Sequence, residues 1–267
     1  MKLTLTVLAA QFFAMTSPAS PPAWQDDFNQ PAGSGPNPAV WTHDIGDNGW
    51  GNAELEYYTD SRENSFVTDD PAATDGKALV IRAVRQADGR ITSARIKTHG
   101  KYAVTHGRIE ARMKLPRGQG IWPAFWMLGD NIEQVPWPAC GEIDLMEVPG
   151  HEPGKLHSTV HGPGYSGKHG LTRSTDLPAG ETFADAYHVF AVDWSPGRLA
   201  WSLDGRVYHT VTPADLPAGA KWVFDGAPFF LLFNLAIGGH WPGYPDATTR
   251  FPQELRIDYV RVYPAGS

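Results

Sequence analysis

Three acidic side chains stand close together near the middle of the chain. They are Glu142, Asp144 and Glu147. If this segment is a strand, successive side chains point to opposite faces, so Glu142 and Asp144 share one side. Glu147 would fall on the other face of a regular strand. One extra residue, in a β-bulge at Leu145 and Met146, would return it to the first face.

Carboxyl groups crowded on one face repel each other, and the repulsion raises the pKa of at least one of them. Glycoside hydrolysis uses this asymmetry, because one ionised carboxylate attacks the anomeric carbon while a protonated one releases the leaving oxygen. In retaining enzymes the two groups lie about 5–5.5 Å apart. On this reading Asp144 would hydrogen-bond the attacking carboxylate and hold its pKa low. A solvated acidic strand face and a divalent-metal site remain open as alternatives.

Tryptophans surround the acidic segment in the sequence. Trp122 and Trp126 precede it, Trp137 is almost adjacent to it, and Trp241 follows later in a glycine-rich stretch. The 10 Trp, 9 Tyr and 12 Phe residues are more than a core of this size usually needs. Flat aromatic rings stack on sugar faces, so tryptophans exposed beside the carboxylates would bind an uncharged polymer.

Charge and cysteine content exclude several classes of function. The formal net charge is −7 and no basic cluster is visible, which argues against binding to nucleic acid or an anionic membrane. Cys140 is the single cysteine, so no intrachain disulfide is expected. It has no histidine at a recognisable spacing, and we predict a buried thiol on a strand. The 10 His residues show no HExxH pattern, so a catalytic transition metal is not expected.

The N-terminus is typical of an export signal. Lys2 supplies a positive charge, residues 3–15 form an apolar run, and Ser17 and Ala19 fit a small-residue cleavage site. The run is shorter than the roughly 20 apolar residues that a membrane-spanning helix needs. We therefore predict a signal peptide over 1–19 and a secreted protein, extracellular or periplasmic.

Alternating apolar and polar residues predict strands rather than helices. The clearest runs are 108–115, 187–195 and 255–260. Asp204 and Gly205, between two such runs, predict a two-residue hairpin turn. No window shows a helical stripe, and 28 Gly and 23 Pro punctuate the chain. Residues 20–267 are thus expected to form one all-β domain, a sandwich of antiparallel sheets.

Several ordered motifs run along nearly the whole mature chain. The acidic segment reads WPACGEIDLMEVPG, and the other motifs are GWGNAELEYYT (49–59), SARIKT (93–98), WPAFWML (122–128), STVHGPG (158–164), FNLAIGGHWPG (233–243) and IDYVRVY (257–263). Together they resemble glycoside hydrolase family 16, in its laminarinase-like branch. The extra residue before Glu147 matches the bulged form of the motif in laminarinases and lichenases.

The resemblance implies a jelly-roll β-sandwich with the substrate cleft on its concave sheet. It implies Glu142 as nucleophile, Asp144 as the assisting aspartate and Glu147 as the general acid/base. No cofactor is implied for catalysis. The implied sugar-binding residues are Asn52, Arg95, Trp122, Trp126, Trp137, His161, Asn234 and Trp241.

Relatives in this family commonly carry a calcium ion on the convex side. By resemblance its ligands here would be backbone oxygens of Asp27 and Gly76 together with the Asp258 side chain. Carbonyl and carboxylate oxygens are the ligands that calcium prefers. We therefore expect a structural calcium ion away from the carboxylates.

The resemblance implies a monomeric, retaining endo-β-1,3-glucanase that acts on laminarin-type β-glucans. Mixed-linkage β-1,3-1,4-glucan is the main alternative substrate, and sulfated galactans would favour a more basic groove. A β-glucan-binding lectin of the same fold is the alternative from another class. Lectins of this kind lack the catalytic carboxylates, whereas Glu142, Asp144 and Glu147 are all present.

Overall fold

Strands account for nearly all regular structure in residues 20–266, the part of the chain that the computed structural model describes. The predicted signal peptide, residues 1–19, lies outside the described residues. Three single-turn 3-10 helices interrupt the strands: η1 (Gly49–Gly51), η2 (Gly167–His169) and η3 (Pro213–Asp215). No helix within residues 20–266 is long and apolar enough to cross a membrane.

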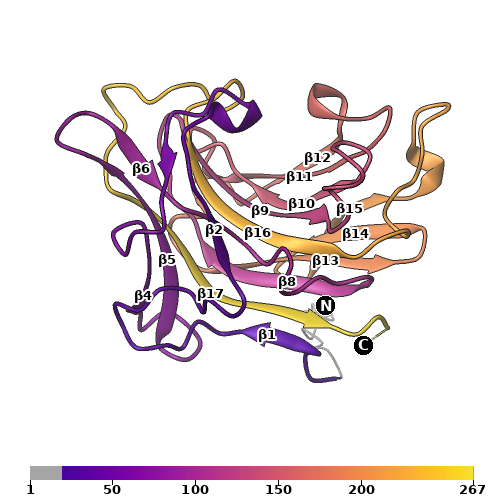
Figure 1. Ribbon diagram of the computed structural model, residues 1–267, viewed down its shortest axis with the longest axis horizontal. Coiled ribbons are helices and arrows are strands. Elements are labelled where there is room, and N and C mark those ends of the chain that lie inside the picture. The colour runs from indigo at the N-terminus through magenta and orange to yellow at the C-terminus, as the bar shows by residue number, and fades with distance from the viewer. Residues whose placement is uncertain (1–19, 267) are drawn as a thin grey trace, which may run out of the picture.

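A seven-stranded antiparallel sheet forms one layer (Figure 1). Its strands, in spatial order, are β12 (Leu171–Asp176), β11 (Lys155–His161), β10 (Glu142–Glu147), β9 (Ile121–Gly129), β16 (Phe229–Ile237), β7 (Arg95–Lys97) and β2 (Thr42–Asp44). The acidic segment is therefore an inner strand with a partner on each side, and its backbone position is set by two hydrogen-bonded ladders.

A ten-stranded sheet forms the second layer. Its main path is β15 (Arg206–Val211), β14 (Arg198–Leu203), β13 (His188–Ser195), β8 (Gly107–Lys114), β17 (Gln253–Tyr263), β5 (Lys77–Arg85), β6 (Ile91–Ser93) and β3 (Tyr57–Tyr58). Beside this path, β1 (Trp24–Asp26) pairs with β17 and β4 (Ser65–Asp69) pairs with β5. Every ladder is antiparallel except the short one between β3 and β6.

The strand predictions are confirmed. The alternating runs at 108–115, 187–195 and 255–260 correspond to β8, β13 and β17. Asp204 and Gly205 join β14 to β15 with φ angles of 48° and 79°. A two-residue primed turn needs positive φ at both positions, which Asp tolerates and Gly favours.

The hydrophobic core lies between the two sheets, and β16 shows how the sequence builds it. All nine residues of β16 are buried. Alternate residues from Phe229 to Ile237 point into the main core, where full burial of each large side chain contributes about 1.5–3 kcal/mol. On the other face Phe230 and Leu232 pack with Leu128 and Cys140 in a smaller cluster. Cys140 is buried as predicted, although it lies in the turn before β10 rather than on a strand.

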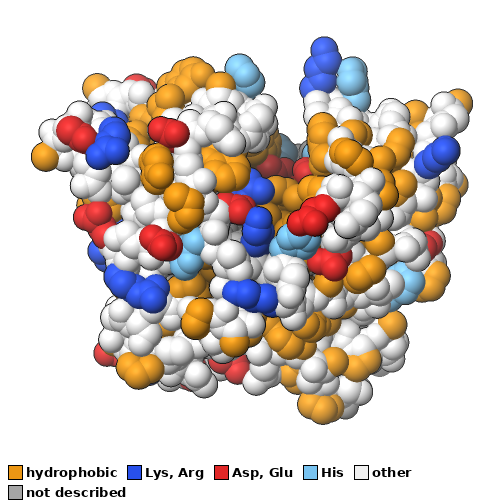
Figure 2. Space-filling model, in the orientation of Figure 1, with side chains coloured by type: hydrophobic (Ala, Val, Ile, Leu, Met, Phe, Trp, Pro, Cys, Tyr) orange, Lys and Arg blue, Asp and Glu red, His pale blue; other side chains and the backbone are white. Residues whose placement is uncertain are grey.

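Both sheets curve in the same sense, and the seven-stranded sheet lies on the inner side of the curve (Figure 1). The space-filling view shows a notch between two lobes at the top of the molecule, with acidic side chains at its floor (Figure 2). The fold thus combines a concave sheet with a cleft, as the jelly-roll prediction requires.

Candidate active site

The predicted β-bulge is present in β10. Asp144 pairs with Trp126 on β9, whereas Glu147, three residues further along, pairs with Ala124, only two residues back. Three residues of β10 therefore span two residues of β9, and the register with β11 shifts at the same point. The extra residue restores the phase, so Glu142, Asp144 and Glu147 lie on one face while the apolar residues of β10 enter the core.

A tryptophan of the opposite sheet fixes the backbone at the bulge. The Trp201 indole Nε1, on β14, donates a hydrogen bond of 2.9 Å to the backbone oxygen of Asp144. Trp201 is fully buried. The bulge disrupts the regular ladder, and this bond satisfies a carbonyl inside the core. The backbone of β10 is therefore positioned from both layers of the sandwich.

The three carboxyl groups are poorly solvated. Asp144 is 3% exposed, and Glu142 and Glu147 are half-buried. Burial, followed by the nearby charge of Asp144, raises the pKa of Glu142 to about 8. Burial also raises the pKa of Asp144 to about 8. The pKa of Glu147 is raised well above its usual value by burial and by both other carboxyl groups.

Polar neighbours favour the ionised form of Glu142. His161 Nε2, on β11, lies 3.5 Å from Glu142 Oε1 and 3.4 Å from Asp144 Oδ2. His161, a hydrogen bond from Trp137 and the charge of Arg95 all lower the pKa of Glu142, although burial and Asp144 outweigh them. Asp144 was expected to lower the pKa of Glu142, but its charge raises that pKa. No hydrogen bond joins the side chains of Asp144 and Glu142 within residues 20–266, and Asp144 Oδ2 has no hydrogen-bond partner there.

Exposed tryptophans flank the carboxyl groups on both sides. Trp137 is 45% exposed, and its ring centre lies 6.2 Å from that of His161. On the other side the Trp122 indole Nε1 donates to Glu147 Oε1 at 3.2 Å. Trp241, 42% exposed, packs edge-on against Trp122 with ring centres 5.4 Å apart. These rings provide apolar surfaces on which sugars would stack, beside both ends of the acidic group.

The other predicted sugar-binding residues share a polar network on the same sheet face. The Trp126 indole Nε1 donates to Asn234 Oδ1 at 2.8 Å. The Arg95 guanidinium lies between the rings of Trp50 and Trp126, 4.8 Å from each. Its Nε is 2.9 Å from Asp44 Oδ2, and Lys97 Nζ lies 2.6 Å from the other oxygen of the same carboxylate. Two cationic side chains therefore share one carboxylate in this part of the cleft.

Tyr58 and Glu54, which were not among the predicted site residues, connect this network to Asn52. The Tyr58 hydroxyl accepts from Asn234 Nδ2 at 3.1 Å and donates to Glu54 Oε2 at 3.1 Å. Glu54 Oε1 in turn accepts from Asn52 Nδ2 at 3.0 Å. Glu56 is fully buried, and burial and then Glu54 raise its pKa well above the usual range. The spacing of Glu54, Glu56 and Tyr58 at every second residue is the sequence pattern that could have identified them.

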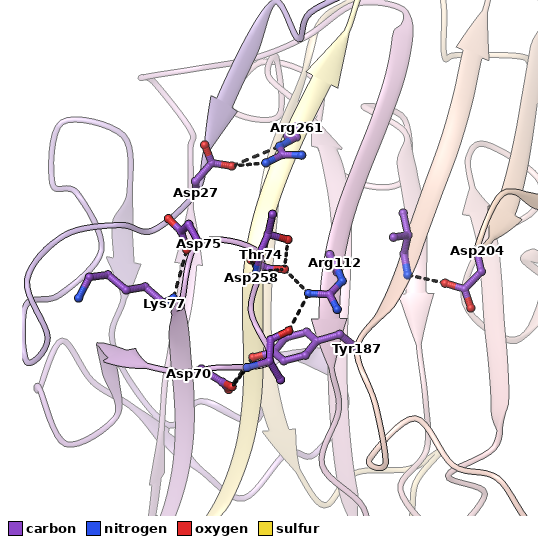
Figure 3. Close-up of polar contacts among 12 residues, drawn as sticks. Asp27, Asp70, Thr74, Asp75, Lys77, Arg112, Tyr187, Asp204, Asp258 and Arg261 are labelled. Carbon is purple, nitrogen blue, oxygen red and sulfur yellow. Dashed lines mark hydrogen bonds and ion pairs between the residues drawn. The ribbon is translucent and has the colours of Figure 1, made fainter. Parts of the chain in front are cut away.

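The residues named for a calcium ion make other contacts. The Asp258 carboxylate is 1% exposed and forms an ion pair with Arg112 (Figure 3). It also accepts from the Thr74 backbone N–H at 3.0 Å and from the Thr74 hydroxyl at 2.7 Å. A calcium ion would compete with these donors for the same oxygens.

One of the two expected backbone ligands also has a partner: the Gly76 carbonyl accepts from the Asp70 backbone N–H at 2.9 Å. At Asp27 the carboxylate, rather than the expected backbone oxygen, accepts from Arg261 at 2.8 Å (Figure 3). A guanidinium already neutralises Asp258, which leaves little negative charge for a divalent cation. The Asp258 side chain therefore offers no free carboxylate oxygen, and the calcium ion stays a prediction.

Comparison with known proteins gives a consistent result. Residues 50–261 match the family described as Glycosyl hydrolases family 16. A beta-glucanase from Rhodothermus marinus is 40% identical over 90% of this chain and 84% of its own length. The laminarinase catalytic domain from Thermotoga maritima is 44% identical, covers 92% of this chain and 99% of its own, and has a TM-score of 0.84. The endo-beta-1,3-glucanase from Pyrococcus furiosus is 47% identical over 92% and 95%, with a TM-score of 0.83.

The Trp201 contact predicts a specific loss of activity. Trp201→Phe leaves the Asp144 carbonyl without its donor, which costs about 1–3 kcal/mol beyond the packing loss. We expect kcat to fall by about tenfold or more, because small misplacements of reacting groups are costly. Trp194→Phe is the matched control, since Trp194 is equally buried and its Nε1 has no partner within the described residues. Denaturant unfolding and kcat separate the two variants; equal kcat values would contradict a positioning role for Trp201.

The ion pair at Asp258 predicts independence from calcium. We expect a chelator such as EDTA to leave the melting temperature unchanged. Arg112→Met should destabilise the protein by about 2–3 kcal/mol, because a buried carboxylate loses its counter-ion while the partly exposed Arg112 site admits water. Thermal and urea unfolding test both statements. A fall in melting temperature that calcium, but not magnesium, restores would show that a calcium ion is bound after all.

Proposed function

Because the chain belongs to glycosyl hydrolases family 16 and is a glycoside hydrolase, we propose that it is a retaining endo-β-1,3-glucanase acting on laminarin-type β-glucans. The observation that carries this proposal is the position of Glu142 and Glu147 on one face across the bulge. A nucleophile and a proton donor can then act on the same sugar from the same side of the sheet.

In the proposed mechanism Glu142 attacks the anomeric carbon and Glu147 protonates the departing glycosidic oxygen. A glycosyl-enzyme bonded to Glu142 results. Glu147, now ionised, removes a proton from a water molecule that attacks the same carbon, and Glu142 leaves with net retention of configuration. Asp144 lies between the two in β10, and its charge raises the pKa of both glutamates.

The surroundings support this division of roles. Glu142 has His161, Trp137 and Arg95 to favour its anion. Burial and the repulsion of two carboxyl groups raise the pKa of Glu147 well above its usual value, although His161 and a hydrogen bond from Trp122 oppose the shift. A raised pKa at Glu147 suits its proposed role as the general acid. The pKa of a general acid must stay high until the leaving oxygen takes the proton.

The cleft supports an uncharged polymer as the substrate. Trp137 and Trp241 offer stacking surfaces on opposite sides of the carboxyl groups, so a chain can extend in both directions. The side chain of Asn52 is exposed and can bond to sugar hydroxyls, and Arg95 shares the Asp44 carboxylate with Lys97.

Substitution of the two glutamates tests the mechanism. We expect Glu142→Gln to abolish hydrolysis of laminarin while binding is kept, since shape and size are unchanged. Glu147→Gln should lower kcat by about 10²–10⁴-fold through loss of proton transfer. Glu63→Gln is the control, because Glu63 is exposed and lies far from Glu142 and Glu147 in the sequence. NMR should show that the product is first released as the β-anomer. Release of the α-anomer first, or wild-type turnover by Glu142→Gln, would contradict the mechanism.

A panel of polysaccharides tests the substrate. Laminarin and curdlan should release reducing sugars, with oligosaccharides of several lengths appearing from the start as endo cleavage requires. Lichenan cleaved in preference to laminarin would instead establish a mixed-linkage glucanase. Tight binding of laminarin without any product would establish a lectin.

We also propose that the protein is exported, on the basis of the signal pattern in residues 1–19. N-terminal sequencing of protein recovered outside the cytoplasm should begin near Ser20. A mature chain that keeps Met1 would contradict the proposal.

A further inference from the structure

Three side chains of the active site bring together donor atoms of the kind that transition metals bind. They are a glutamate oxygen of Glu142, an aspartate oxygen of Asp144 and an imidazole nitrogen of His161. The three atoms lie within 4.8 Å of one another. We propose that these residues form a binding site for a single divalent transition-metal ion such as Zn²⁺, and that the bound ion blocks hydrolysis.

The distances match tetrahedral coordination. Zinc binds nitrogen and oxygen at roughly 2.0–2.2 Å, so two of its ligand atoms lie about 3.3–3.5 Å apart. His161 Nε2 is 3.5 Å from Glu142 Oε1 and 3.4 Å from Asp144 Oδ2. Two edges of the tetrahedron are therefore formed already, and only the edge between the two carboxylates has to shorten by side-chain rotation.

A second observation points to a missing partner. Asp144 is 3% exposed, yet its Oδ2, the oxygen that faces His161, has no hydrogen-bond partner within residues 20–266. An unpaired buried carboxylate oxygen is costly. A cation between Asp144 and Glu142 would bond this oxygen and would also relieve the repulsion between the two carboxylates.

The backbone holds the three ligands in place. Glu142 and His161 are direct cross-strand partners on β10 and β11, and Asp144 follows on the same face of β10. The fourth position would be filled by water from the cleft. One imidazole with two carboxylates suits zinc or copper better than calcium, which prefers six or more oxygen ligands.

Occupation of this site prevents the proposed reaction. A metal-bound Glu142 cannot use the same oxygen to attack carbon, and the ion with its water fills the place of the sugar. We therefore expect reversible inhibition that competes with the glucan. This inhibition rests on the proposed function, whereas the metal binding does not.

The test uses the full chain after removal of metals. Calorimetric titration with Zn²⁺ should show one site, and laminarin should weaken the apparent affinity. His161→Gln should lower the affinity at least tenfold. His169→Gln is the matched control, because His169 is exposed in η2, after the end of β11, and is not one of the three ligands. It should bind Zn²⁺ as the wild type does. Circular dichroism and melting temperature confirm that each variant is folded.

Cobalt provides a second measurement that does not depend on activity. Co²⁺ bound tetrahedrally by one nitrogen and three oxygens gives a strong visible absorption band. Octahedral Co²⁺ absorbs only weakly in the same region. The band should appear on titration of the wild type and be lost in Asp144→Asn. Zn²⁺ affinity and a Co²⁺ band that survive both His161→Gln and Asp144→Asn would overturn the site.

The two proposals fail separately. A protein that cleaves laminarin but binds no Zn²⁺ through His161 overturns the metal site and leaves the glucanase standing. A protein that binds Zn²⁺ through His161 and Asp144 but cleaves no polysaccharide of the panel overturns the glucanase and leaves the metal site.

Discussion

One extra residue in β10 determines whether this protein has an active site. Without the bulge at Leu145 and Met146, Glu147 would point away from Glu142 and into the apolar core. The bulge has a cost, because it interrupts the ladder and leaves backbone groups to be satisfied. The structure meets this cost from the other sheet, where Trp201 donates to the Asp144 carbonyl. The packing of one sheet against the other therefore also fixes the position of the carboxyl groups.

The site also depends on a balance between burial and charge. Burial raises the pKa of all three carboxyl groups, which in the proposed mechanism would keep a proton available for the leaving oxygen. His161, Trp137 and Arg95 oppose that shift at Glu142, where the proposed mechanism needs an anion. The same balance bears on the proposed metal site. A cation bound by His161, Glu142 and Asp144 would remove the repulsion between the two carboxylates, which is otherwise relieved when one of them takes up a proton.

The buried carboxyl groups of the two sheets differ in how their charges are paired. On the concave face like charges are crowded together around Asp144, which is useful only for chemistry or for a cation. On the ten-stranded sheet the buried Asp258 is matched by Arg112 and by donors from Thr74 (Figure 3). A buried charge that loses its partner destabilises a fold, whereas a charge left unpaired in a cleft stays available for reaction.

Features that depend on neighbours along the chain could be predicted from the amino-acid sequence. Alternation predicted β8, β13 and β17, Asp204 and Gly205 predicted the hairpin, and residue counting predicted the bulge. The tertiary structure alone decided the contacts between distant segments: Trp201 with Asp144, Tyr58 with Asn234, and Arg112 with Asp258. It also decided the pKa of each carboxyl group. Strand periodicity is local, but burial and hydrogen bonding depend on which segments the fold brings together.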